Sequence, residues 1–166
     1  MYAKTFGETT CGINGEEIIV EVDISNGLPA FELVGLPDTA VRESRERVRA
    51  ALKNSGYKFP TTRITVNLAP ADFKKDGSGL DLPIAIGILC GSGQITAEAI
   101  SDKVFVGELA LDGSIREVSG ILPMIIKAKE TCRKEIYIPP GNAAEGELVD
   151  GIEVFAPESL TQLTMH

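Results

Sequence analysis

Histidine and cysteine are scarce in this sequence. The single histidine is His166, the last of 166 residues, which argues against a histidine-based catalytic triad or a histidine-ligated metal site. The three cysteines are odd in number and share no spacing typical of metal sites; they are Cys11, Cys90 and Cys132. We therefore expect a domain of the reducing cytoplasm that holds no metal.

Long apolar runs and nucleotide-binding motifs are also missing. The longest apolar run, residues 82–90, contains Pro83 and Gly87 and is far shorter than the ~18 residues of a membrane span. The first residues lack the basic-then-apolar build of a signal peptide. No G-x-x-x-x-G-K-[ST] motif occurs. We expect no membrane contact and no P-loop.

What the chain does have is enough apolar residues for a core, and an uneven distribution of charge. Hydrophobic residues make up 43% of the sequence, and its length fits one domain over residues 1–166. The net charge is −8, yet residues 38–75 hold nine Lys/Arg against four Asp/Glu, a net +5, while the remainder holds seven against 20, a net −13. One basic region on an otherwise acidic domain indicates a surface directed at a binding partner.

The first third of the sequence is predicted to form β-strands. Residues 2–9 indicate a short strand, and residues 17–24 alternate between apolar and polar positions. Asn26-Gly27 is a hairpin turn signal, so we expect Phe31 and Leu33 to lie in a partner strand.

A charged helix is predicted next, with Asp38 as its N-cap and Gly56 just past its end. One face is apolar, and the opposite face carries Arg42, Arg45, Arg49 and Lys53 together with Glu46. The spacing predicts the ion pairs Arg42–Glu46 and Glu43–Arg47. Such a face is either a solvated surface or a contact for a ligand or subunit.

A strand over residues 62–68 then leads into a Gly-rich loop, and Asp81 is predicted to cap a helix that is apolar all round. Strands are expected at 104–106, 108–111, 115–118, 136–138 and 152–155, and helices at 119–129, 142–145 and 158–163, with a hairpin turn at Asp112-Gly113. Strand-rich units interleaved with helices, and no G-x-G-x-x-G motif, favour an α+β fold over a doubly wound sheet.

Several stretches closely resemble the N-terminal domain of the ComM/YifB family of Mg-chelatase-like AAA+ ATPases. They are residues 31–50 (FELVGLPDTAVRESRERVRA), 63–70 (RITVNLAP), 75–85 (KDGSGLDLPIA), 107–113 and 119–123. The resemblance implies a Lon-protease-like fold, shared with GHMP kinases, in which helices pack a mixed sheet on one side. It also implies an AAA+ motor that binds ATP and Mg C-terminal to this domain, a hexameric ring, and DNA branch migration during recombination or DNA uptake.

The resemblance also locates the catalytic positions of a Lon-type peptidase, in which a lysine amine activates a serine hydroxyl. The nucleophile's position falls on Gly79 and the lysine's position on Leu122. Glycine has no hydroxyl nucleophile and leucine has no amine. Ser78 stands one position before the nucleophile's position, and this alignment places no base within its reach. We expect no peptidase activity.

Two other uses of the basic stretch remain open. The loop of Asp76, Gly77, Ser78, Gly79 and Asp81 could bind a phosphate at the helix N-terminus, but its carboxylates favour a structural role. Alternatively, a basic face could contact DNA or a neighbouring subunit through Arg42, Arg45, Arg49, Lys53, Lys74 and Lys75. The nearby aromatics, Tyr57, Phe59 and Phe73, are too irregularly spaced to indicate base stacking.

The sequence thus predicts a catalytically silent accessory or assembly domain of a DNA-acting ATPase, without a cofactor of its own. An enzyme with a phosphate-ester site at Gly77–Asp81 and a pure oligomerisation module are the alternatives.

Overall fold

A computed structural model describes residues 1–165 of the chain, and His166 lies outside this range. Within the described range, a seven-stranded sheet runs in the order β3-β4-β2-β1-β5-β8-β9. Its strands are β1 Tyr2–Cys11, β2 Asn14–Ser25, β3 Ala30–Val34, β4 Arg63–Ala69, β5 Lys103–Phe105, β8 Glu135–Tyr137 and β9 Glu153–Phe155. A separate two-stranded ribbon pairs β6 Glu108–Leu109 with β7 Ile115–Arg116.

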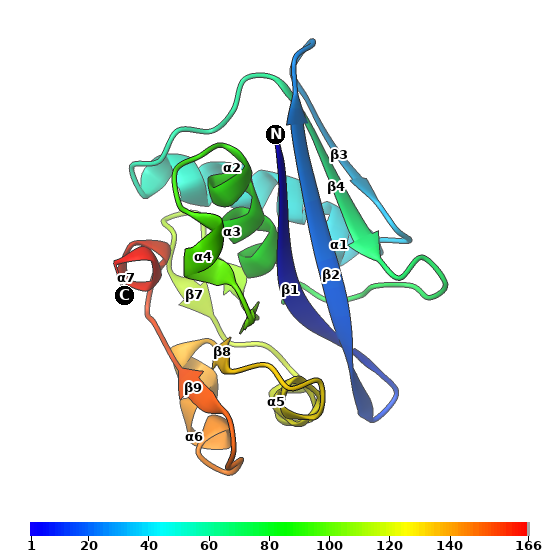
Figure 1. The fold of residues 1–166 in the computed structure, drawn as a ribbon, viewed down its shortest axis with the longest axis vertical. Coiled ribbons are helices and arrows are strands. Elements are labelled where there is room, and N and C mark those ends of the chain that lie inside the picture. Colours follow the sequence, from blue (N-terminus) through cyan, green and yellow to red (C-terminus); the bar gives the residue numbers. More distant parts are fainter. Residues whose placement is uncertain (166) are drawn as a thin grey trace.

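The helices connect and cover these strands, as Figure 1 shows. They are α1 Thr39–Arg42, α2 Ser44–Asn54, α3 Asp81–Gly91, α4 Ala97–Ile100, α5 Ile121–Glu130, α6 Ala143–Gly146 and α7 Leu160–Thr164, with a 3₁₀ turn at Pro140–Asn142. None of the helices within residues 1–165 is both long and apolar enough to cross a bilayer.

The sheet is mixed, which confirms the predicted α+β class. Strands β1 and β2 form a long antiparallel hairpin, and β2 also pairs antiparallel with β4. The pairs β3–β4, β1–β5, β5–β8 and β8–β9 are parallel. The expected hairpin at Asn26-Gly27 is wrong, because β4 lies between β2 and β3. A turn motif predicts that the chain changes direction, but it does not predict that the two flanking strands pair with each other. Here a strand from later in the chain lies between them.

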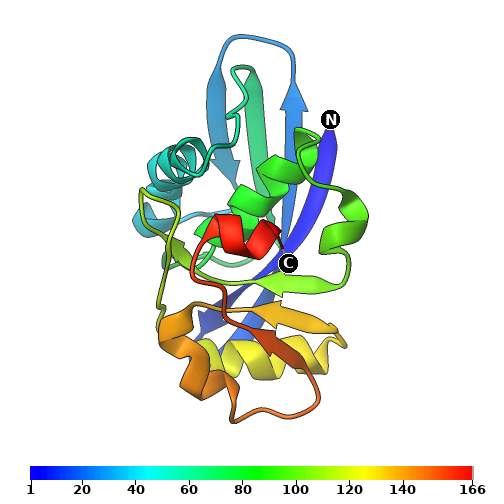
Figure 2. The same cartoon turned by 90° about the vertical axis from the view of Figure 1, so that its left-hand side faces the viewer.

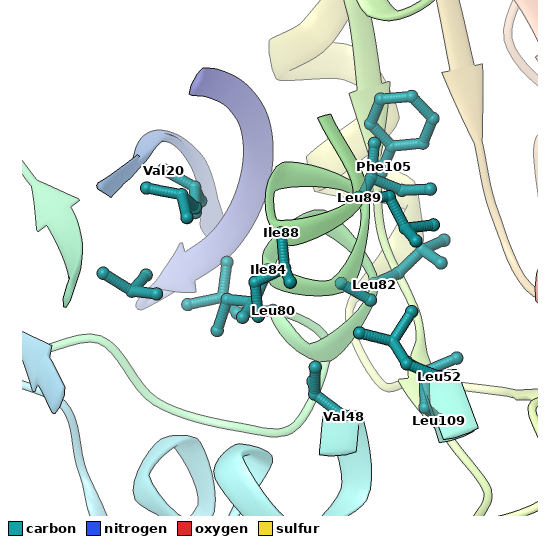
Figure 3. Packing of buried hydrophobic residues seen from close by; sticks show 14 of the residues in the cluster. Val20, Val48, Leu52, Leu80, Leu82, Ile84, Ile88, Leu89, Phe105 and Leu109 are labelled. Atoms are coloured by element: carbon teal, nitrogen blue, oxygen red, sulfur yellow. The ribbon is translucent and has the colours of Figure 1, made fainter. Parts of the chain in front are cut away.

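Helix α3 is the centre of the larger core. It is buried almost all round, as its sequence predicts, and Figure 3 shows Val20 of the sheet on one side of it and Val48 and Leu52 of α2 on another. Two glycines allow α3 and the sheet to pack closely. A Cβ on Gly7 of β1 would lie 2.8 Å from Pro83 Cγ, and a Cβ on Gly87 of α3 would lie 2.7 Å from Val22 Cγ2. Larger residues there would push α3 off β1 and β2.

Over β3 and β4 the helices lie on one side of the sheet, as expected. Farther along the sheet they lie on both sides. Helix α5 packs near the turn end of the β1–β2 hairpin (Figure 2), on the face opposite α3. There it buries Phe6, Ile121, Met124 and Ile125 in a second apolar cluster with β5 and β8. The one-sided arrangement therefore ends at β1, where side chains alternate between the two clusters: Thr5 hydrogen-bonds the carbonyl of Pro83, whereas Phe6 faces α5.

The predicted charged helix begins as expected but is not continuous. Asp38 caps α1 by accepting a hydrogen bond from the Val41 N–H at 2.7 Å, and Gly56 follows α2 with a positive φ of 88°. The helix breaks at Glu43, where the Glu46 N–H bonds the Glu43 carbonyl at 3.2 Å, a tightened turn. The hairpin turn at Asp112-Gly113 and the predicted C-terminal elements are confirmed to within a few residues.

Candidate functional site

The Gly-rich loop between β4 and α3 is fastened to two other parts of the chain. The Lys75 N–H donates to the Leu36 carbonyl, and the Asp38 N–H donates to the Lys75 carbonyl, both at 2.9 Å. The Thr9 hydroxyl donates to the Asp76 carbonyl at 3.2 Å. These bonds hold the loop between the start of α1 and strand β1.

A cleft of about 510 Å³ opens beside this loop. Its lining comes from β1, the start of α1, the loop itself, the segment after β7, and α5; the residues are 8–10, Asp38, Ala40, 76–79, 117–119 and Met124. Four carboxylates line it, and among the described residues no Lys or Arg does; they are Glu8, Asp38, Asp76 and Glu117. The cleft is therefore acidic.

The position of a Lon-type nucleophile lies in the wall of this cleft. A Cβ on the buried Gly79 would lie 3.4 Å from Val106 Cγ1 and 3.6 Å from Val118 Cγ1, so a side chain there faces aliphatic carbon. Leu122 is half-buried on α5, and it is Met124 of that helix that lines the cleft. Ser78 lines the cleft too, but no basic side chain of residues 1–165 accompanies it there. The geometry thus offers no activated nucleophile.

The N-terminus of α3 is poorly suited to an anion. Its first N–H groups are already engaged: Asp81 N–H donates to the Ser78 carbonyl and Leu82 N–H to the Gly107 carbonyl, each at 3.1 Å. Pro83, the next residue, has no N–H. With carboxylates around the loop as well, a phosphate would find few donors and an unfavourable potential.

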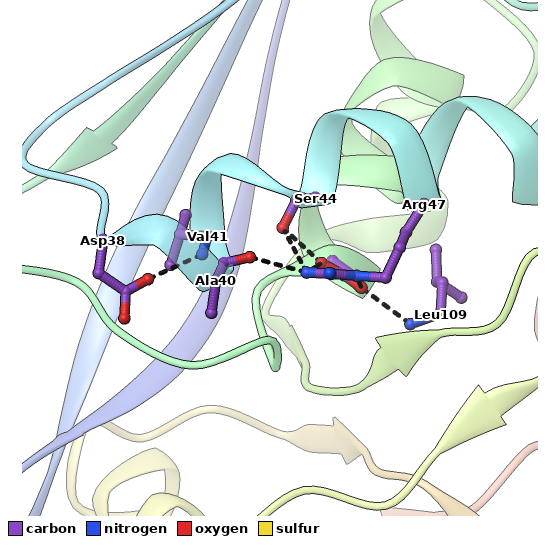
Figure 4. A network of polar contacts seen from close by, with 7 residues as sticks. Asp38, Ala40, Val41, Ser44, Arg47 and Leu109 are labelled. Atoms are coloured by element: carbon purple, nitrogen blue, oxygen red, sulfur yellow. Dashed lines mark hydrogen bonds and ion pairs between the residues drawn. The ribbon is translucent and has the colours of Figure 1, made fainter.

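The prediction that Asp81 caps α3 is wrong. Leu80 is the N-cap, and the Asp81 side chain is fully buried and turned toward α2. It accepts hydrogen bonds from the Ser44 hydroxyl, from Arg47 Nε at 2.6 Å and Nη2 at 3.0 Å, and from the Leu109 N–H at 3.0 Å. Figure 4 shows Ser44, Arg47 and Leu109 converging on this point. The network joins α2, α3 and β6.

Burial and the hydrogen bonds between the two side chains shift the pKa values of Asp81 and Arg47. Burial raises the pKa of Asp81, and the donated hydrogen bonds of Arg47, Ser44 and Leu109 oppose that rise. The hydrogen bond to Asp81 raises the pKa of Arg47. The predicted pair Glu43–Arg47 is therefore wrong. Arg47 pairs instead with the buried carboxylate of Asp81, 34 residues away, and not with the exposed Glu43 between α1 and α2.

Lys75 is not available as a DNA contact, contrary to the sequence prediction. Its side chain is buried, Nζ donates to the Pro70 carbonyl, and Nζ lies 4.8 Å from the centre of the Phe73 ring. Burial lowers the pKa of Lys75. Its neighbour Lys74 is exposed.

The outer face of α1 and α2, which we call the basic face, consists of Arg42, Arg45, Arg49 and Lys53. Arg42, Arg45 and Lys53 are exposed, and within residues 1–165 none of them forms an ion pair. Arg49 instead pairs with Glu46 at 3.1 Å and lies 5.4 Å from the Phe59 ring centre, so the predicted Arg42–Glu46 pair is wrong.

A groove of about 250 Å³ runs beside the basic face. It is lined by Arg49 and Lys53, by Phe31 and Phe59, and by the segments at residues 29–30 and 60–62. Its mixture of cationic, aromatic and hydroxyl groups suits a sugar–phosphate chain or an acidic protein segment.

One unusual residue was missed by the sequence interpretation. Glu8, on β1, is 1% exposed, and neither carboxylate oxygen has a hydrogen-bond partner within residues 1–165. Burial, and secondly Glu17 directly opposite on β2, raise the pKa of Glu8 to about 9. Its burial follows from α5 covering this face of β1, which the prediction of a short strand at residues 2–9 could not reveal.

The other titratable side chains give no sign of a metal centre. In residues 1–165 no group of three or more His, Cys, Asp or Glu side chains is placed to hold a metal ion.

Comparisons with known proteins agree with the fold. A family model described as subunit ChlI of Mg-chelatase matches residues 20–142. Competence protein ComM of Haemophilus influenzae is 44% identical over 158 residues, which is 95% of this chain and 31% of that protein. The uncharacterized protein YifB of Escherichia coli is 48% identical over 140 residues, 84% of this chain and 28% of that protein.

A more distant similarity reaches the Lon proteases. Lon protease 2 of Bacillus subtilis is 26% identical over 144 residues, which is 82% of this chain and 26% of that protein. This similarity fits the predicted Lon-like α+β fold. The chain spans about a third or less of the length of the curated relatives it matches.

Proposed function

The chain belongs to the family described as subunit ChlI of Mg-chelatase, with relatives named ComM and YifB, and we propose that it serves a longer DNA-acting ATPase as a non-proteolytic accessory or assembly domain. In this proposal the basic face meets DNA or a neighbouring subunit. ATP hydrolysis, Mg binding and formation of a hexameric ring belong to the remainder of that longer protein.

The observation that carries the proposal is the basic face itself. On a chain of net charge −8, Arg42, Arg45 and Lys53 are exposed on α1 and α2 and form no ion pair within the described residues, while Glu46, an exposed acid among them, pairs with Arg49. The face therefore keeps a surplus of positive charge, and a surface that binds phosphates needs such a surplus. The name of the competence protein among the relatives supports a role connected with DNA uptake.

Peptide hydrolysis is not part of the proposal. The wall of the cleft has glycine where a Lon-type nucleophile belongs, and among residues 1–165 no Lys or Arg lines the cleft. The alternative of a phosphate-ester enzyme at Gly77–Asp81 is disfavoured by the engaged N–H groups of α3 and by the carboxylates around the loop.

The test is fluorescence anisotropy of labelled single- and double-stranded DNA with the purified chain at low salt. We expect binding that Arg42→Glu/Arg45→Glu weakens at least tenfold, because two phosphate contacts become repulsive. The matched control is Lys129→Glu/Lys134→Glu, the same charge change on exposed residues elsewhere, which should leave affinity within about twofold.

Sedimentation velocity separates the two forms of the proposal. If the basic face meets a subunit, the wild type self-associates and Arg42→Glu/Arg45→Glu does not, whether or not DNA is present. Absence of both DNA binding and self-association in the wild type would overturn the proposal. Self-association without DNA affinity, unaffected by the variant, would support a pure oligomerisation module instead.

A further inference from the structure

The acidic cleft contains a buried acid that lacks a partner. Glu8 is 1% exposed and lines the cleft, and both of its carboxyl oxygens are without a hydrogen bond in residues 1–165. Leaving a buried polar group unpaired costs roughly 1–3 kcal/mol, so native proteins rarely keep one without a use.

Neither of the two cations near Glu8 hydrogen-bonds its carboxylate within residues 1–165. Burial raises the pKa of Glu8 most, and the charges of Glu17, directly opposite on β2, and of Glu16 raise it further; Lys127 on α5 and Arg133 after it lower the pKa. Arg133 Nε is held by Glu17 at 2.7 Å. Lys127 lines a different pocket, between α5 and the turn of the β1–β2 hairpin. A partner for Glu8 must therefore come through the cleft.

The lining of the cleft selects the charge of that partner. Asp38, Asp76 and Glu117 add negative charge, and among the described residues no Lys or Arg lines the cleft. Asp38 is partly satisfied by the Val41 and Gly77 N–H groups, and Asp76 by the Thr9 hydroxyl, which leaves Glu8 as the deepest unpaired group. Such a potential attracts a cation and repels an anion.

The shape of the lining indicates an organic cation rather than a metal ion. No cluster of metal-ligating side chains exists within residues 1–165, and the carboxylates are spread around the cleft. Apolar carbon lies beside them, from Ala40, Val118 and Met124. A volume of about 510 Å³ falls in the range of small-molecule sites.

We propose that this cleft binds an alkylammonium group, with the ammonium at the Glu8 carboxylate and the methylene chain along Val118 and Met124. The group comes either from a lysine side chain of a polypeptide or from a free polyamine, since both present the same chemistry. The proposal does not involve the basic face, so it stands or falls separately from the proposed function.

Binding also moves a proton. With its pKa at about 9, Glu8 holds its proton at pH 7, and an adjacent cation favours the ionised form. The Glu8 proton then leaves to solvent while the ammonium keeps its three. About one proton is released for each ligand bound at pH 7.

The experiment uses the purified chain and three probes: spermidine, an acetyl-Gly-Lys-Gly-amide peptide, and the same peptide with norleucine in place of lysine. We expect saturable NMR shifts at Thr9, Gly77 and Val118 with spermidine, the lysine peptide or both, and none with norleucine. Spermidine alone identifies a polyamine site, and binding of the lysine peptide identifies a polypeptide site. Calorimetry in buffers of different ionisation heat counts the proton.

Glu8→Gln keeps the size of the protonated acid and removes the ionisable group. It should weaken binding at least tenfold and abolish proton release, whereas Glu98→Gln, an exposed acid on α4, should change neither. Equal binding by Glu8→Gln, equal binding of the norleucine peptide, or no saturation by either ammonium ligand up to about 10 mM overturns the proposal. The norleucine comparison and the proton count need only the wild-type chain, so they decide the matter if Glu8→Gln fails to fold.

Discussion

Glu8 makes the stability of this protein depend on pH in an unusual direction. Its pKa is about 9 in the folded chain against an ordinary value of 4.5. Between these values the folded protein holds a proton that the unfolded chain has lost. The stabilisation is fully present below about pH 4.5 and is lost as the pH rises toward 9.

The size of the effect follows from the one proton involved. One pKa unit corresponds to a little over 1 kcal/mol, so Glu8 alone removes roughly 3 kcal/mol of stability between pH 6 and pH 8. Glu8→Gln is neutral at both pH values and does not have this dependence. The free energy of unfolding of the variant should therefore gain roughly 3 kcal/mol relative to the wild type across that interval, a relative shift in Tm of about 6–12 °C.

Urea denaturation followed by circular dichroism at pH 6, 7 and 8 measures this difference. Glu98→Gln, an exposed acid, is the matched control and should run parallel to the wild type. Subtracting the variant from the wild type removes the contributions of all other titrating groups. Parallel curves for wild type and Glu8→Gln, differing by less than about 0.5 kcal/mol between pH 6 and 8, would refute the assignment of Glu8 as a buried, protonated acid.

Two further substitutions test the interior and the cleft. Arg47→Ala should lower the free energy of unfolding by ~3–5 kcal/mol in urea denaturation, because it leaves the buried Asp81 carboxylate without its cation. A loss below about 1 kcal/mol would contradict that role. Gly79→Ser should not hydrolyse labelled casein above the blank, because the new side chain faces Val106 and Val118 and no lysine of residues 1–165 lines the cleft. Turnover that a serine-directed inhibitor blocks would refute this expectation.

Local patterns were predictable from the sequence where local physics decides. Alternation along residues 17–24 gave β2 its buried face, and the all-apolar stretch after Asp81 gave the central helix. Asp38 caps α1 as its residue type predicts, since an N-cap needs only its own first turn. These features depend on residues within a few positions of each other.

Contacts between distant segments explain several of the errors. Asp81 has the sequence context of an N-cap, but Arg47 and Ser44 recruit its carboxylate from α2. Lys75 lies in a basic stretch yet turns inward to the Pro70 carbonyl. Strand β4 inserts beside β2, which no turn signal near Asn26 could indicate. Long-range pairing outweighs the local preference at Asp81 and at β4, whereas Lys75 is drawn inward by a carbonyl only five residues away.

The burial of Glu8 belongs to the same class. Its residue type predicts an exposed acid. Only the placement of α5 on that face of β1 buries it, and only the pairing of β1 with β2 sets Glu17 opposite. Acidic side chains at such positions are where a sequence-based interpretation misses a candidate site.

The salt dependence of DNA binding tests the central claim most directly, because it counts the phosphates that the basic face contacts. If Arg42, Arg45 and Lys53 each neutralise one phosphate of duplex DNA, log K should fall with log salt with a slope of about −2.7 or steeper. Arg42→Ala/Arg45→Ala should make that slope shallower by about 1.8. Equal slopes for the two proteins, measured by anisotropy over the same salt range, would contradict the claim that this face meets DNA.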